Sequence, residues 1–436
     1  MALMILHGGC VGLRPLSRVT PIATGVTTRE FTSSLLATGR SVEQHDELCY
    51  GAPMATHVVV LGAGFGGLEL VSGLSESVPD KVQITLIDKN ESFMFGFSKL
   101  DVMFGRRPVS ELWNPYRLIA KPGVEFRQET VTSIDAARRR VVTDAAIYDA
   151  DILVVALGAD YDAAATPGLA EDGYEFYSAA GAERARDALS GFGGGAVVVG
   201  VLGPFFKCPG APNETALLLH DYLSRRGLRE SSTIQLVTPL PMPIPISKRT
   251  SSAIVAILKE HGIEYWPSSR VTGLDPEHHV AHLDDGRQLP YDLFLGIPVH
   301  CAPEVVVASD LAVDGWIPVD PATFATRFPN VFAVGDVTSA PVPRAGGIAE
   351  GEAATVAKVL ISQLTDGSVP PPYDGASACY VELGDDLVGR IDVDFLSYDT
   401  PVAKFTAPTS ALTEEKQEWG SKRAARWFGH ESSAAL

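Results

Sequence analysis

The pattern of apolar and polar positions becomes regular at residue 57. Residues 57–61 read HVVVL, an apolar run typical of a buried strand. The next stretch, GAGFGGLELVSGL, switches to helical spacing, with apolar side chains at Leu68, Val71 and Leu74. A second apolar run, VQITLID, ends at Asp88. The pattern predicts a strand, a helix and a strand in succession, the opening of a parallel α/β sheet.

The turn between the first strand and the helix contains Gly62, Gly64 and Gly67 in a GxGxxG spacing. The first glycine permits a tight turn, the second lets the backbone approach a pyrophosphate, and the third lets helix and strand pack closely. Asp88 ends the next strand, where it can accept hydrogen bonds from ribose hydroxyls, and Lys89 directly follows it. We take all five residues as candidate contacts to a dinucleotide. The alternative is a glycine-rich turn without a ligand.

Two later strands are expected to complete this site. The segment DILVVALGAD reads as a buried strand that ends in a glycine turn at Gly158. The segment NVFAVGDVTS runs into Gly335 and Asp336, and an aspartate there can hydrogen-bond the ribityl chain of a flavin. A helix follows in PRAGGIAEGEAATVAKVL, and its first turn, which includes Gly346, can face an isoalloxazine ring.

These segments, in this order, resemble the large family of two-dinucleotide-fold flavoproteins, which includes disulfide reductases, type II NADH dehydrogenases and sulfide dehydrogenases. The resemblance covers roughly residues 55–430, with a mild departure from the ATG-like strand of the family at Ala156–Gly158, and it implies FAD as cofactor. It also implies an α/β fold of two Rossmann-like dinucleotide-binding domains, the second inserted in the first, plus a small C-terminal α+β cap. The expected boundaries are 54–170 and 296–369 for the FAD domain, 171–295 for the second domain, and 370–436 for the C-terminal domain.

The inserted unit lacks an intact nucleotide fingerprint. Its first strand, AVVVG, is followed by Leu202 and Phe205 where glycines are needed, and their side chains would block a pyrophosphate. The next strand, IQLVTP, ends with Thr238 where a carboxylate would be wanted. We therefore do not expect this unit to bind NAD(P) tightly.

Two cysteines lie in segments with candidate chemistry. Cys208 follows Lys207 and precedes a helix expected to begin near Asn213, a good N-cap residue. A neighbouring lysine and a helix N-terminus should favour the thiolate. Cys379 lies on the first of two strands joined by a turn near Asp385–Asp386. Without context, a cysteine is more often a small buried side chain than a catalyst.

The segments PFFKCPGAPNE and ACY resemble those of sulfide:quinone oxidoreductases and of the flavoprotein subunit of flavocytochrome c sulfide dehydrogenase. This resemblance implies that Cys208 and Cys379 form a redox pair, that Glu214 shuttles protons, and that the partners are a small sulfur substrate and a quinone or cytochrome acceptor. Several such enzymes carry a third redox cysteine, and none occurs between Cys49 and Cys208. Arg344 stands where this class often has lysine. A cation there would stabilise the reduced flavin anion, and the alternative is a solvated surface arginine.

Composition narrows the partners further. The 436 residues carry a formal net charge of −18, so binding to nucleic acid is not expected. The chain contains five widely spaced cysteines and no CxxC, so no metal site is expected. No apolar run reaches the roughly 18 residues that span a bilayer. We expect a cytoplasmic protein, with peripheral contact to the inner face of the membrane left open and the oligomeric state not predicted.

The two ends of the chain differ in character. Residues 1–53 show no strand or helix period and are expected to form a disordered extension. The tail ALTEEKQEWGSKRAARWFGH reads as a helix that packs on the body, the alternative being an interfacial membrane helix. Three functions are compatible with the sequence: a sulfide-oxidising flavoenzyme, which we favour, an NAD(P)H-dependent flavin reductase like type II NADH dehydrogenases, and a non-enzymatic flavin-fold binding module.

Overall fold

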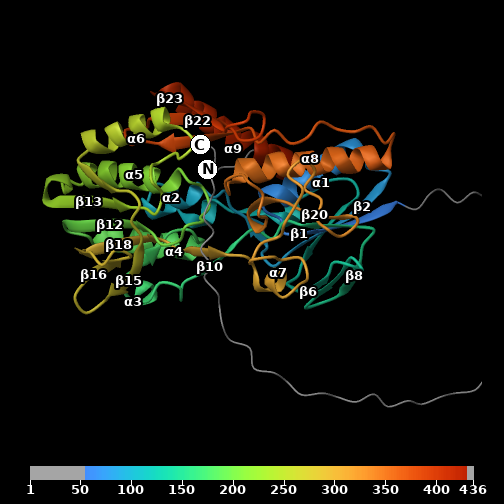
Figure 1. The fold of residues 1–436 in the computed structure, drawn as a ribbon, viewed down its shortest axis with the longest axis horizontal. Helices are drawn as coiled ribbons and strands as arrows, with labels where there is room; N and C mark the ends of the chain where they lie inside the picture. The colour runs from blue at the N-terminus through green and yellow to red at the C-terminus, as the bar shows by residue number, and fades with distance from the viewer. Residues whose placement is uncertain (1–54, 430–436) are drawn as a thin grey trace, which may run out of the picture. The chain divides into compact units, whose positions relative to one another are not determined.

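The computed structural model describes residues 55–429. The predicted extension, residues 1–53, and with it Cys10 and Cys49, lies outside the described residues. The fold is α/β, with two separate five-stranded parallel sheets and helices packed against them, as the sequence predicted (Figure 1).

The first sheet has the strand order β20-β9-β1-β2-β5. All four pairings are parallel, and Val60 at its centre pairs with Leu86 on one side and Val154 on the other. Residues 58–61 of β1 are fully buried, as expected for a parallel sheet covered on both faces. Helices α1 and α8 pack closely against each other. The bounds are Thr56–Leu61 for β1, Val82–Asp88 for β2, Val124–Gln128 for β5, Ile152–Val155 for β9, Val331–Ala333 for β20, Phe65–Ser77 for α1 and Gly346–Leu364 for α8.

The second sheet has the order β11-β18-β12-β13-β14 and is also parallel throughout. Its bounds are Tyr174–Glu175 for β11, Gly195–Val201 for β12, Ser232–Val237 for β13, Ile263–Trp266 for β14 and Leu293–Ile297 for β18. The helices beside it are α4 (Ala179–Gly191), α5 (Ala211–Arg225) and α6 (Lys248–Glu260). Both sheets therefore contain the strand–turn–helix unit that the hydrophobic pattern predicted.

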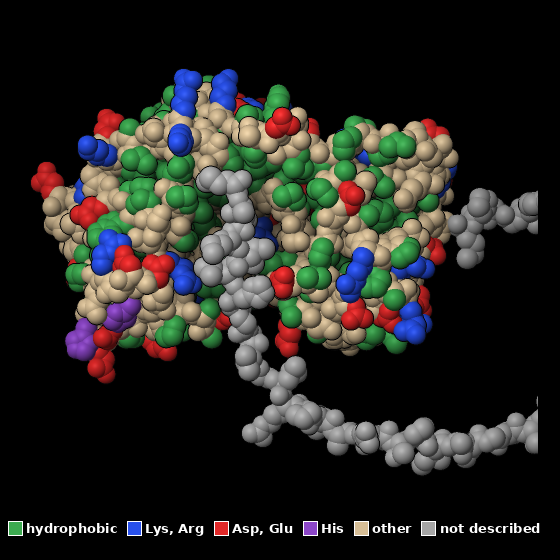
Figure 2. All heavy atoms as spheres, in the orientation of Figure 1, with side chains coloured by type: hydrophobic (Ala, Val, Ile, Leu, Met, Phe, Trp, Pro, Cys, Tyr) green, Lys and Arg blue, Asp and Glu red, His purple; other side chains and the backbone are tan. Residues whose placement is uncertain are grey.

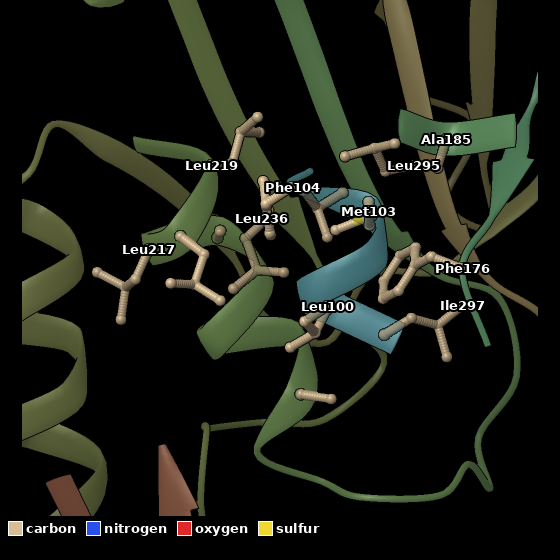
Figure 3. Packing of buried hydrophobic residues seen from close by; sticks show 14 of the residues in the cluster. Leu100, Met103, Phe104, Phe176, Ala185, Leu217, Leu219, Leu236, Leu295 and Ile297 are labelled. Carbon is tan, nitrogen blue, oxygen red and sulfur yellow. The ribbon is translucent and has the colours of Figure 1, made fainter. Parts of the chain in front are cut away.

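A short helix from the first half of the chain belongs to the core of the second sheet. Helix α2 (Ser98–Met103) packs against α4. Figure 3 shows Leu100, Met103 and Phe104 among side chains of α5 and of the second sheet, including Leu236 and Ile297. The segment after β2 is thus held between the two sheets.

The C-terminal part forms an antiparallel sheet, β21-β22-β23, and a long helix, α9. The strands Ser377–Glu382 (β21) and Val388–Asp394 (β22) are joined by a turn in which Asp385 and Asp386 both have positive φ, as predicted. The third strand, β23 (Val402–Thr409), was not predicted. Helix α9 (Ser410–Phe428) buries Trp427 and Phe428 in the core around α1, which supports the packed helix over the membrane helix.

The remaining elements are small. The short strands are β3 (Ser92–Phe93), β4 (Asn114–Pro115), β6 (Val131–Asp135), β7 (Arg140–Thr143), β8 (Ile147–Asp149), β10 (Asp160–Asp162), β15 (Val271–Asp275), β16 (Val280–Leu283), β17 (Gln288–Pro290) and β19 (Val299–Cys301). The short helices are α3 (Leu169–Asp172), α7 (Glu304–Val307) and the 3-10 turns Val109–Glu111, Tyr116–Leu118, Arg229–Ser231 and Gly335–Val337.

Two further observations bear on the partners and boundaries. Within residues 55–429, no helix is both long and apolar enough to cross a bilayer. Figure 2 shows acidic, basic and apolar side chains interspersed over the face in view. The described residues, 55–429, group as one compact unit by their contacts, so the domain boundaries given above remain a prediction.

Candidate functional site

The three glycines after β1 occupy three different environments. Gly62 has φ +99°, and a Cβ there would lie 2.3 Å from the Ala156 carbonyl oxygen. A Cβ on Gly67 would lie 1.9 Å from the carbonyl oxygen of Gly62. Both glycines are therefore required by the fold itself. A Cβ on Gly64, the N-cap of α1, would meet no heavy atom within 4 Å, so the side of the turn that would approach a pyrophosphate is open.

The end of β2 is tied to this turn by Asp88. One carboxylate oxygen accepts the Ala63 N–H at 2.8 Å, and the other accepts the backbone N–H of Asn90 at 2.8 Å. Asp88 thus fixes the glycine turn relative to the next strand, and its contact with a ribose stays a prediction. Lys89 is exposed, and its predicted role is likewise untested.

The two later strands of the first sheet, β9 and β20, also end in the predicted glycine turns. Gly158, after β9, has φ +69°, and Gly335, after β20, has φ +78°. The Gly335 N–H donates to the carboxylate of Glu352 on α8. Burial raises the pKa of Asp336, against the opposing charges of Lys207, Arg344 and Lys99. An acid surrounded by cations is therefore held at the point where the resemblance expects the flavin ribityl chain.

Arg344 is anchored at this turn and is not a solvated surface side chain. Its Nε donates to the Asp336 carbonyl at 2.9 Å, and Nη2 donates to the Thr338 carbonyl at 3.2 Å. Its guanidinium lies 3.9 Å from the centroid of the Trp316 ring. These contacts hold the cation against the turn that follows β20. The proposed stabilisation of a reduced flavin anion remains a prediction.

Lys99, on α2, was missed by the sequence reasoning. It is partly buried, and its ammonium group has no hydrogen-bond or ion-pair partner among residues 55–429. Burial, followed by the charge of Lys207, lowers its pKa to about 8, whereas Glu175 and Asp336 oppose the shift. An unpaired ammonium near Asp336, together with the open turn at Gly64, fits a polar, anionic cofactor such as FAD. A single lysine on a short helix carries no motif that would have identified it.

Cys208 lies on a constrained loop between β12 and α5. It adopts the left-handed conformation, φ +54°, which is uncommon for a residue with a side chain. Its N–H donates to the Arg344 carbonyl at 2.7 Å, and its carbonyl accepts the Ala211 N–H at 2.9 Å. The helix begins at Ala211 with Gly210 as N-cap, so the predicted start near Asn213 was wrong. Because proline is favoured in a first helical turn, the proline of the APNE segment marks the true start.

Lys207 fixes this loop through a buried aromatic cluster. Its carbonyl accepts the Tyr177 hydroxyl at 2.9 Å, its N–H donates to His300 Nε2 at 3.3 Å, and its Nζ donates to the Ala159 carbonyl at 3.2 Å. The ammonium also lies 4.6 Å from the centroid of the Tyr161 ring. These contacts direct the ammonium toward the first sheet.

The expectation that the Cys208 thiolate would be favoured was therefore wrong for the protein alone. Burial raises the pKa of Cys208, and the nearby charges of Cys379 and Glu214 add to the increase. Burial likewise raises the pKa of Cys379 to about 11, with Glu214 contributing. Desolvation of the sulfurs outweighs the helix N-terminus.

The structure brings Cys208, Cys379 and Glu214 to one site, although they come from three elements. Glu214, in the first turn of α5, is buried and accepts the Glu382 N–H from β21 at 3.0 Å. Cys379 lies on the same strand and pairs with Ile391 of β22. Both cysteines are free thiols, as is Cys301, which pairs with Asp160 between β19 and β10. No group of three or more side chains suited to a metal occurs in the described part of the chain.

Two parallel nucleotide-type sheets, an open glycine turn and a pair of half-buried cysteines define an oxidoreductase of the flavin type. The chain belongs to the pyridine nucleotide-disulphide oxidoreductase family, whose pattern matches residues 56–357. It is 27% identical over 364 residues to a sulfide-quinone reductase of Aquifex aeolicus, covering 76% of this chain and 82% of the relative. It is 26% identical over 385 residues to a type II NADH:quinone oxidoreductase of Staphylococcus aureus, covering 79% and 90%.

Solved structures show the same fold. The sulfide:quinone oxidoreductase of Aquifex aeolicus superposes with a TM-score of 0.76 at 22% identity, over 86% of this chain and 92% of that chain. An NDH2 from Plasmodium falciparum, in complex with NADH, superposes with a TM-score of 0.65 at 14% identity, over 86% and 96%. The chain is thus an FAD-dependent oxidoreductase, which disfavours the non-enzymatic alternative.

Proposed function

We propose that this flavoenzyme oxidises sulfide or a related sulfur species through Cys208 and Cys379. Electrons then pass through FAD to a quinone or a cytochrome. The observation that carries the proposal is the convergence of both cysteines and Glu214 on one buried site. That site is joined to the cofactor-binding turn by the bond from the Cys208 N–H to the Arg344 carbonyl. The relative from Aquifex aeolicus is named a sulfide-quinone reductase.

The chemistry is thiol–disulfide exchange. A hydrosulfide ion attacks one sulfur of a Cys208–Cys379 disulfide, which forms a persulfide on that cysteine and releases the other as a thiolate. A second hydrosulfide attacks the outer sulfur of the persulfide, which releases a disulfane and the second thiolate. FAD, when bound, supplies the two-electron sink that reoxidises the two thiolates to the disulfide.

The residues around the sulfurs would control protons and position. Burial raises the pKa of Glu214, so this carboxyl can hold a proton beside the sulfurs and exchange it with a thiolate. Low polarity around the thiols favours the disulfide and the neutral persulfide over separated charges. The left-handed Cys208 and the cluster around Lys207 would keep the attacked sulfur in position.

A second candidate is an NAD(P)H-dependent flavin reductase, which the type II NADH:quinone oxidoreductase relative favours. Against it stands the turn after β12. Leu202 is buried there in the core, and Phe205 lies exposed where a glycine would be needed. These side chains leave no backbone surface for a pyrophosphate. Contact with the membrane surface, required if the acceptor is a quinone, is also part of the proposal.

Anaerobic titration of the FAD-loaded protein separates the two candidates. Sulfide should bleach the flavin rapidly, and NADH should bleach it poorly. Rapid and saturable bleaching by micromolar NADH, without a response to sulfide, would establish the second candidate instead.

Variants of the cysteines test the mechanism. Cys208→Ser and Cys379→Ser should each retain FAD and lose sulfide-dependent flavin reduction by at least about a hundredfold, because the exchange needs both sulfurs. Cys301→Ser is the matched control and should keep the wild-type rate, because Cys301 pairs with Asp160 between β19 and β10. Wild-type rates in either of the first two variants would exclude the persulfide route.

A further inference from the structure

A chain of charged side chains leads away from Glu214. Lys416, on α9, places its Nζ 3.6 Å from Glu214 and forms an ion pair with Glu382. Glu382 in turn bonds to Arg106, whose guanidinium pairs with Asp101 at 2.8 Å. The groups lie on α5, α9, β21 and α2 and in the loop that follows α2, which are separate segments of the chain. The chain is therefore a product of the tertiary fold.

This charged chain runs from the interior to solvent. The exposed fractions of the side chains rise from 5% at Glu214 to 11% at Lys416 and 15% at Glu382. The fraction is 35% at Arg106. Lys416, Glu382 and Arg106 line a cavity of about 320 Å³, and so does Asp386, whose side chain is 87% exposed. Of the five linked groups, Glu214 is the one that does not line this cavity, and it lies near the two cysteines.

The two carboxyls that share Lys416 have pKa values that are shifted in opposite directions. Glu214 faces Cys208, Cys379, Tyr177, Arg106, Glu382 and Lys416, and burial raises its pKa. The cations Lys416 and Arg106 overcome burial at Glu382 and hold its pKa at about 2. Lys416 itself faces Glu214, Glu382 and Asp101, and its Nζ lies 5.3 Å from the Phe97 ring centroid. A carboxyl whose pKa is raised, an ammonium and a carboxylate whose pKa is held low thus stand in sequence, each in contact with the next, which is an arrangement that can relay protons.

We propose that Lys416 and Glu382 form a proton path that connects Glu214 to the cavity lined by Arg106 and Asp386. When Glu214 gives its proton to a sulfur, Lys416 passes a proton to Glu214 in the same step in which cavity water beside Glu382 returns a proton to Lys416, so that neither a neutral Lys416 nor a protonated Glu382 has to persist. Each step moves one proton and no electrons. Arg106, which cannot be deprotonated, is a positioning residue for Glu382. The link to the sulfurs rests on the proposed function, whereas the path from Glu214 to solvent does not.

Infrared spectroscopy of the FAD-loaded full chain tests the path without any substrate. In D2O, the protonated-carboxyl band that is lost in Glu214→Gln should exchange rapidly in the wild type. In Lys416→Met, which keeps the volume of the side chain and removes the ammonium, exchange should slow by at least about tenfold. Glu382→Gln should slow it as well. Lys422→Met is the matched control, because Lys422 lies on the same helix, is 70% exposed and forms an ion pair with Glu418 at the surface.

The sulfide reaction gives the second measurement. Lys416→Met should retain FAD and lower sulfide-dependent flavin reduction with a larger solvent isotope effect, and Lys416→Arg should not restore the rate, since a guanidinium does not release protons. Unchanged exchange of the Glu214 band in both Lys416→Met and Glu382→Gln would overturn the path. So would the absence of a Glu214 band in the wild type. A protein whose band behaves as expected but whose flavin ignores sulfide would refute the proposed function and leave the path standing.

Discussion

The two strand–turn–helix units use the same local architecture for different purposes. Residues 62–64 separate β1 from α1, whereas residues 202–210 separate β12 from α5. The first turn is short and glycine-rich, so the helix N-terminus lies directly at the strand end, with open space beside Gly64. The second turn is long, fills the space after the strand with Leu202, and presents the side chain of Cys208. A turn that binds a pyrophosphate through its backbone amides requires glycines. A turn that presents a cysteine side chain does not require them.

Gly64 gives the strongest test of the difference between the two turns. Gly64→Val should yield colourless protein, with bound flavin lowered by at least about tenfold, which corresponds to about 1.4 kcal/mol of binding free energy. The fold should persist, because a Cβ at Gly64 meets no heavy atom within 4 Å. Flavin absorbance per chain and circular dichroism measure the two effects. Gly193→Val is the matched control, with equally open space and no place in the turn. A fully yellow Gly64→Val protein would refute the assignment of this turn to FAD.

The corresponding position in the second unit should respond in the opposite way. Leu202 is 1% exposed and packs in the cluster that contains Val198 and Phe294. Leu202→Ala should therefore lower the free energy of unfolding by about 2–5 kcal/mol, measured by urea denaturation. It should not create a response of the flavin to NADH. If the variant were as stable as the wild type and became reducible by NADH, the second turn would be a masked nucleotide site.

Most of the fold could be predicted because short local patterns of apolar residues, glycines and turn residues indicate its elements. The apolar runs before Gly62 and Gly200 mark both parallel sheets, and the turn at Asp385–Asp386 marks the C-terminal hairpin. Strand β23 was not predicted, because none of its side chains is fully buried and its two faces differ little in exposure. Propensity alone could not separate such a strand from a loop.

The site could be predicted only where a motif exists. Cys208, Cys379 and Glu214 lie in recognisable segments, and their convergence then follows from the fold. Lys99 and Lys416 lie in no motif, and the charged groups near them are distant in sequence. The raised pKa of Cys208 also required the structure, because desolvation depends on how the C-terminal sheet covers the loop.

A smaller effect is expected from the histidine that supports the second turn. His300 Nδ1 donates to the Pro298 carbonyl at 2.8 Å, and Nε2 accepts the Lys207 N–H, so the ring is neutral. Burial and the charge of Lys207 lower its pKa from 6.5 to about 3. Its contribution to stability is present above pH 6.5 and is lost as pH falls from 6.5 toward 3.

Urea denaturation between pH 7 and pH 4 measures this dependence. The wild type should lose up to about 1.4 kcal/mol per pH unit through His300 in that window. His300→Gln, which keeps an acceptor for the Lys207 N–H, should show a correspondingly flatter dependence. Parallel profiles of the two proteins would contradict a neutral, buried His300.

The smallest effect is expected at Phe205, the second residue that replaces a glycine of the fingerprint. Its side chain is 59% exposed, and its ring centroid lies 5.5 Å from the Arg344 guanidinium. Phe205→Ala should therefore change the free energy of unfolding by less than about 0.5 kcal/mol. Because Leu202 still fills the strand end, NADH should remain a poor reductant of the variant. A substantial gain in NADH-dependent flavin reduction would mean that an exposed ring alone masks a nucleotide site, and that the two turns differ less than their glycines suggest.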